Sequence, residues 1–104
     1  MSWFGIRSIL HHTNDEVYEE RIVLVQADDL DSAFSSAQNE AKTYVRSLGE
    51  GHTFTGYSDS YQIDSDKFEN LSEVFSLMRS SKLEPGQYID RYYDTGNERR
   101  VNLP

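Results

Sequence analysis

The residues of this chain most able to bind a metal are its three histidines, and their spacing argues against a metal site. His11 and His12 are adjacent in a segment expected to be a strand, where neighbouring side chains point to opposite faces, so they cannot chelate one ion together. His52 lies in a glycine-containing loop with no second ligand beside it in sequence. The chain has no cysteine, which excludes disulfides and thiolate chemistry. We therefore predict no metal and no cofactor.

Glu19 and Glu20, followed by Arg21, are the residues best placed for acid–base chemistry. Alternation along a strand puts Glu19 and Arg21 on one face and Glu20 on the other. A carboxylate beside an apolar strand can have a raised pKa and act as an acid or base. The same carboxylates could instead pair with Arg7 or Arg79 across a sheet, and we favour this structural role. No catalytic residue is assigned.

Other catalytic motifs are missing from the sequence. No serine lies in a G-x-S-x-G elbow, and no lysine follows the glycines in the spacing of a phosphate-binding loop. The run from Asp64 to Asp66 begins like a calcium loop, but the later ligand and glycine positions do not match. These exclusions favour a protein that is not an enzyme. The alternative is a small hydrolase or transferase that uses Glu19 or Glu20.

The aromatic residues indicate a binding role. The chain has seven tyrosines, and Tyr88, Tyr92 and Tyr93 fall on one short predicted helix near its end. Tyrosine supplies contact area together with a polar tip, and it is enriched at the hot spots of protein interfaces. These three residues are therefore predicted to contact a partner. The alternative is that this helix only covers an open face of the sheet.

The net charge of −8 is unevenly distributed. Residues 1–78 carry 14 acids and 5 bases, whereas residues 79–104 carry 4 acids and 5 bases. We exclude nucleic acid as a partner, because phosphate binding needs a basic surface. A basic protein is the expected partner, and solubility alone is the alternative explanation of the acids. The exposed acids expected to meet such a partner are Asp15, Glu16, Asp28 and Asp31.

The elements that must position these residues begin with a hairpin. Ser2–His12 and Val17–Gln26 are predicted to be antiparallel strands joined by a polar turn. Four consecutive apolar residues, from Ile22 to Val25, favour a central strand with both faces buried.

A helix is predicted over Leu30–Ser47, because its apolar residues recur at spacings of three and four. Asp29 can cap its start, and Gly49 can end it. The small residues Ala37 and Ala41 are expected to face the sheet closely.

The second half predicts two more strands and a short helix. Thr53–Ile63 is expected to be the third strand. Glu73–Ser80 also fits a helical stripe, but its short length favours a fourth strand. Pro85 suits the first position of a helix that Gly96 would end. Residues 1–97 are predicted to form one domain and residues 98–104 a loose tail.

Several of these segments together resemble a known family. They are Trp3, the YEERIVL run of residues 18–24, Ala27, the alanine-rich helix, the FTGYSDSYQI strand and EVFS of residues 73–76. The set is similar to an uncharacterised bacterial family, domain of unknown function 4288, over residues 3–79. The resemblance implies a strand at 73–80 and an extension after Ser80, and it implies no activity or catalytic residue.

The predicted fold is α+β, with a four-stranded, mostly antiparallel sheet in ββαββα order and the main helix on one face. The predicted function is a non-enzymatic interaction domain, such as an acidic, immunity-type neutraliser of a basic protein. A homo-oligomeric structural domain, including a homodimer, is a further alternative. No apolar run approaches the ~20 residues of a membrane span, and no signal peptide is evident, so we expect a cytoplasmic protein without a membrane partner.

Overall fold

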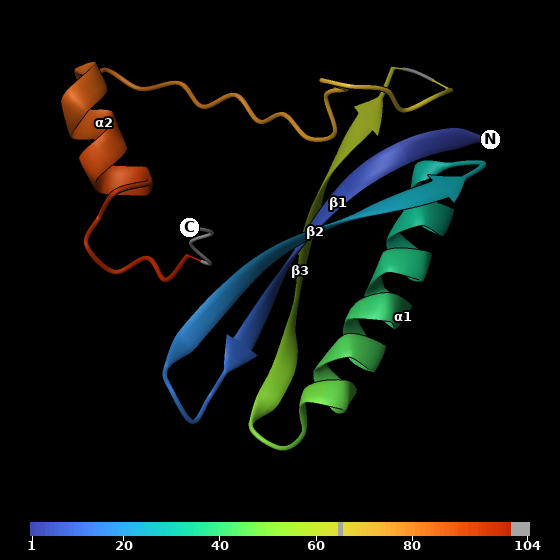
Figure 1. Ribbon diagram of the computed structural model, residues 1–104, viewed down its shortest axis with the longest axis horizontal. Helices are drawn as coiled ribbons and strands as arrows, with labels where there is room; N and C mark the ends of the chain where they lie inside the picture. The colour runs from blue at the N-terminus through green and yellow to red at the C-terminus, as the bar shows by residue number, and fades with distance from the viewer. Residues whose placement is uncertain (65, 101–104) are drawn as a thin grey trace.

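The computed structural model describes residues 1–64 and 66–100, and its described elements form an α+β domain. Figure 1 shows one helix packed along a sheet and a second helix standing apart from it. In chain order the elements are β1 (Ser2–His12), β2 (Val17–Ala27), α1 (Leu30–Leu48), β3 (His52–Ile63) and α2 (Pro85–Tyr92). The predicted α+β class and the first three strands are confirmed.

The sheet has three antiparallel strands in the order β2-β1-β3, so β1 is central. The expectation that β2 would be central is wrong. Val23 and Val25 pack on the core beneath α1, but Ile22 and Leu24 alternate with them and face away from it. The four apolar residues of β2 therefore mark an edge strand that presents apolar side chains on both faces.

Helix α1 covers one face of the sheet. Its buried residues follow one stripe, Ala33, Ala37, Ala41 and Val45. They meet Phe4, Ile6 and Leu10 of β1, which form the core of the domain. The Asp29 side chain caps the helix by accepting a hydrogen bond from the Ser32 backbone N–H at 2.7 Å, as predicted. Gly49 ends the helix, and the alanines leave room for close packing on the sheet.

The predicted fourth strand, Glu73–Ser80, is not present among the described residues, and the strand implied by the family resemblance is wrong as well. This part of the chain crosses the face of the sheet instead of running along an edge. A Cβ atom at Gly5 would overlap the backbone carbonyl of Val74, so the two backbones touch face to face. A segment lying on a sheet face cannot join its hydrogen-bond ladder.

Residues 77–84 are exposed and lead away from the sheet to α2 (Figure 1). Pro85 occupies the start of α2 as predicted, but the helix ends at Tyr92 and not near Gly96. In the predicted tail, Arg100 donates to the Tyr93 carbonyl at 2.6 Å, and residues 101–104 lie outside the described part. No helix of the described residues is long and apolar enough to cross a membrane.

Candidate interaction site

The sheet face opposite α1 is open along β2. In the register of the sheet, Ile22 pairs with Arg7 and Leu24 pairs with Gly5, which places both apolar residues on this face. Tyr18 lies on the same face, since it is separated from Ile22 by an even number of residues. The exposed fractions of Tyr18, Ile22 and Leu24 are 62%, 46% and 44%. We call these three residues the open row.

Residues 68–76, the covering segment, shield the other half of this face. Phe68 packs edge-on against Trp3 at 4.8 Å between ring centroids. Phe75 lies near Tyr61 at 6.5 Å and beneath the Arg7 guanidinium at 5.1 Å. The covering segment therefore protects the β1 and β3 side of the face and leaves the open row of β2 uncovered.

An ion-pair network borders the open row. Arg7 donates from Nε to Asp59 Oδ1 at 3.1 Å and from Nη2 to Asp59 Oδ2 at 2.6 Å. The hydrogen bond with Asp59 is the main cause that raises the pKa of Arg7. Arg7 Nη1 also lies 3.6 Å from Glu20 Oε1, which confirms the predicted pairing across the sheet. The Glu20 side chain remains 66% exposed, so its carboxylate can also meet a cation from another molecule.

Glu19 occupies the opposite face, under α1. Its Oε1 lies 2.9 Å from His12 Nε2, and its two oxygens accept hydrogen bonds from the Tyr44 hydroxyl at 3.2 and 3.0 Å. Burial and this hydrogen bond raise the pKa of Tyr44. Arg21 lies 3.9 Å above the Tyr44 ring and pairs with Glu40. Sequence reasoning missed Tyr44 and Glu40, although their i, i+4 spacing places them on one side of α1.

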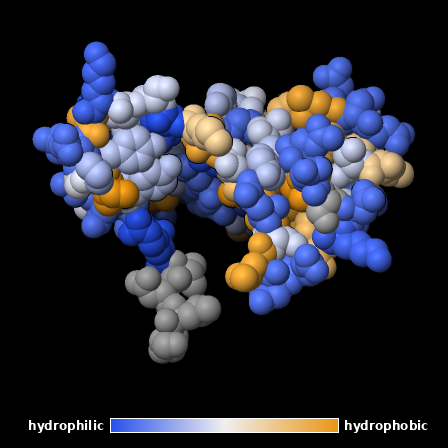
Figure 2. Space-filling view, turned by 90° about the horizontal axis from the view of Figure 1, so that it is seen from above, coloured by the Kyte–Doolittle hydropathy of each residue, from blue (hydrophilic) through white to orange (hydrophobic). Residues whose placement is uncertain are grey.

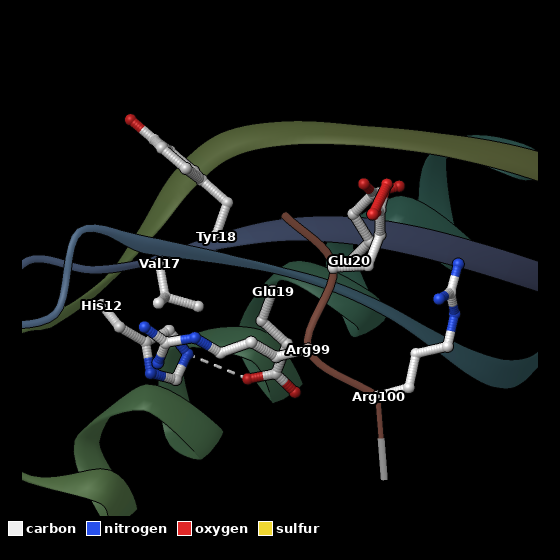
Figure 3. Close-up of a pocket in the computed structure, with 8 residues that line it drawn as sticks. His12, Val17, Tyr18, Glu19, Glu20, Arg99 and Arg100 are labelled. Atoms are coloured by element: carbon white, nitrogen blue, oxygen red, sulfur yellow. Dashed lines mark hydrogen bonds and ion pairs between the residues drawn. The ribbon is translucent and has the colours of Figure 1, made fainter. Parts of the chain in front are cut away.

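A shallow pocket of about 450 Å³ lies where His12 and Glu19 approach the end of the described chain. Figure 3 shows the His12–Glu19 hydrogen bond and the side chains of Arg99 and Arg100 around this pocket. The described residues that line it are His12, Val17, Tyr18, Glu19, Glu20, Glu98, Arg99 and Arg100. Its lining combines carboxylates, arginines and one histidine, an arrangement that supports polar binding.

The histidines divide between the two faces as predicted. His11 stacks on Tyr18 at 4.3 Å between ring centroids, beside the open row. His12 meets Glu19 on the other face, and the His52 ring approaches it at 4.7 Å, a neighbour that the sequence did not reveal. No cluster of three or more metal-ligating side chains occurs in the described ranges 1–64 and 66–100.

Helix α2 carries the predicted tyrosines but does not cover the sheet. Among the described residues it packs against no other helix or strand. Tyr88 and Tyr92 contact each other at 4.8 Å, and Arg79 lies 4.3 Å above the Tyr92 ring while it donates to the Tyr88 hydroxyl at 2.8 Å. Arg79 therefore interacts with the tyrosines of α2, whereas the sequence had allowed it to pair with Glu19 or Glu20. Figure 2 shows hydrophobic surface on the α2 end, at the left, and on the sheet end, at the right.

The predicted acidic residues are not brought together. Asp15 and Glu16 lie in the turn before β2, whereas Asp28 and Asp31 lie beyond its far end. A strand of this length separates the two groups by about 35 Å. All four are exposed, and they border opposite ends of the molecule without forming one acidic surface.

These features define a small α+β domain with one helix packed on a three-stranded antiparallel sheet and an open row on the opposite face. The family model described as domain of unknown function (DUF4288) matches residues 6–76, more than half of the chain, and the chain belongs to this family. The match begins within β1, includes the rest of the sheet, α1 and the covering segment, and ends before α2. Comparisons with curated proteins and with solved structures found no match.

Proposed function

We propose that this chain is a non-enzymatic protein-interaction domain that binds a partner through the open row of β2. The observation that carries the proposal is the exposure of three large apolar or aromatic side chains along β2, on the sheet face opposite α1, with Glu20 between Tyr18 and Ile22. Exposed apolar side chains gathered beside polar groups are typical of protein interaction sites.

The open row can contribute substantial binding energy. Full burial of a side chain such as leucine or isoleucine is worth about 1.5–3 kcal/mol. Ile22 and Leu24 are already about half-buried, so a partner would gain roughly 1 kcal/mol from each. Tyr18 adds an aromatic ring with a hydroxyl at its edge, which suits a hot spot. Glu20 lies between Tyr18 and Ile22 on the same face and favours a partner with a cation beside an apolar patch.

The geometry around Glu19 and Glu20 supports a structural role more than catalysis. Both carboxylates already have partners, His12 and Tyr44 for Glu19 and Arg7 for Glu20. The acidic-neutraliser form of the hypothesis rests on the net charge of −8. Because the predicted acids lie at both ends of β2, this charge would steer a basic partner towards the molecule without defining its contact surface.

The test is capture of partners on immobilised full-length chain, compared between the wild type and two variants. Leu24→Glu places a charge in the open row, whereas Leu30→Glu makes the same change at a residue of similar exposure in the first turn of α1. We expect Leu24→Glu to abolish capture of a specific partner and Leu30→Glu to retain it. Equal capture by both variants would contradict a binding role for the open row.

A further inference from the structure

After α2 the chain returns to the first half of β2. Residues 95–100, which we call the strap, line the pocket of about 450 Å³ together with that half of the strand (Figure 3). A second pocket lies between the same two segments. Tyr18 and Glu19 point to opposite faces of the sheet, yet both line the first pocket. The strap therefore lies along the free edge of β2, the edge that does not pair with β1.

Hydrogen bonds fix the shape of the strap. The Glu98 carboxylate accepts from the Thr95 backbone N–H at 2.8 and 3.0 Å, and this bond lowers the pKa of Glu98 to about 2. Arg100 donates from Nη2 to the Tyr93 carbonyl at 2.6 Å. These two charged side chains are therefore held by the strap itself and by the end of α2, and the strap is a compact loop.

Arg99 is the charged residue of the strap that is left to face β2. It makes no hydrogen bond or ion pair with another described residue, and it lines the first pocket together with Glu19 and Glu20. Figure 3 shows its side chain extending toward His12 and Glu19. Residues 15–20 carry four acids and no base, whereas the strap carries one acid and two bases. The two walls of the pocket therefore attract each other, and an arginine can bind a carboxylate with two parallel hydrogen bonds.

We propose that the strap closes on the first half of β2 by pairing Arg99 with the carboxylates of Glu19 and Glu20, and that it competes there with the partner of the open row. The competition rests on the proposed function, whereas closure is a property of the single chain. A closed strap covers Tyr18, which lines both pockets and is the most exposed residue of the open row. It leaves the two aliphatic residues of the row free, because neither pocket extends beyond Glu20.

The strap acts as a regulatory device because its closure is weak. Ion pairs between exposed side chains contribute little and are screened by salt, so the strap opens and closes in equilibrium. A partner that needs Tyr18 binds only the open form, and its apparent affinity falls by the fraction of chains that are open. Charge reversal at Arg99 replaces the attraction with repulsion and should favour the open form.

Paramagnetic broadening of NMR signals measures closure in the isolated full-length chain. The chain has no cysteine, so Asn97→Cys gives a single attachment point for a spin label. We expect the label to broaden the amide signals of residues 17–20. Arg99→Glu, or salt of about 0.5 M, should reduce this broadening at least about threefold. Lys82→Glu is the matched control, because it makes the same change of charge in the exposed linker 77–84, outside the strap.

Broadening that Arg99→Glu leaves unchanged overturns the strap, and so does an equal loss of broadening in Lys82→Glu. In the capture assay, at a partner concentration below saturation, Arg99→Glu should retain about threefold more partner than wild type or Lys82→Glu. Equal capture by Arg99→Glu and Lys82→Glu overturns the competition. If Arg99→Glu opens the strap but Leu24→Glu captures as much partner as Leu30→Glu, the proposed function is wrong and closure of the strap stands.

Discussion

Replacing Gly5 by Ala should destabilise the domain, although strand propensity alone predicts the reverse. Glycine in a strand interior normally costs about 0.5–1 kcal/mol relative to alanine. At this position, however, the added Cβ would overlap the Val74 carbonyl oxygen, so the covering segment must move. Overpacking of this kind costs about 1–3 kcal/mol.

The size of the effect follows from the contacts that depend on the covering segment. A shift of Val74 displaces Phe75 from Tyr61 and Arg7, and aromatic pairs are worth about 0.5–1.5 kcal/mol each. We expect the free energy of unfolding to fall by about 2 kcal/mol, which lowers the Tm of a chain of this length by about 8 °C.

Urea unfolding and tryptophan emission would measure this prediction. Trp3 is the only tryptophan and contacts Phe68 of the covering segment, so its emission should shift to longer wavelength as the segment moves. Gly86→Ala is the control, because the same Cβ would enter open space in α2. A Gly5→Ala protein as stable as wild type, with unchanged emission, would refute the close approach of the two backbones.

Three further predictions concern the core, the helix cap and metal content. Ala37→Leu should lower the free energy of unfolding by about 1–3 kcal/mol, because Ala37 is 1% exposed against the sheet; an unchanged Tm would contradict this packing. Asp29→Ala should lower the Tm most at neutral pH. The backbone hydrogen bond from Ser32 lowers the pKa of Asp29 in the folded protein. The stabilisation that the Asp29 carboxylate provides is therefore complete above the ordinary pKa of 3.8 and is lost as the pH falls through the folded pKa. A Tm difference that does not shrink in acid would contradict the charged cap. Purified protein is expected to hold no stoichiometric transition metal, and one zinc per chain by elemental analysis would refute that expectation.

Local signals in the sequence were sufficient to predict the strands and the helix that pack together. The β1–β2 hairpin, the Asp29 cap and the alanine stripe of α1 depend on residues near one another in sequence, and all three predictions are confirmed. The sequence also allowed Glu19 or Glu20 to pair with Arg7 or Arg79, and Glu20 pairs with Arg7.

The remaining features depend on contacts distant in sequence. The apolar run of β2 could not reveal that one of its faces would lack a cover, because that depends on where residues 68–76 cross the sheet. Glu73–Ser80 has the composition of a strand, but its backbone contact with Gly5 places it on a face. The Glu19–Tyr44 contact and the proximity of His12 to His52 depend on how α1 and β3 pack against the hairpin.

The most direct test of binding through the open row is a photo-crosslink from position 22. A photoreactive amino acid replaces Ile22 in the full-length chain, which is irradiated in the cells that make it and analysed by mass spectrometry. We predict crosslinked peptides that join residue 22 to a second polypeptide, and we expect Leu24→Glu to abolish them. Crosslinks confined to single chains, or no crosslinked peptide from position 22, would contradict binding through this face.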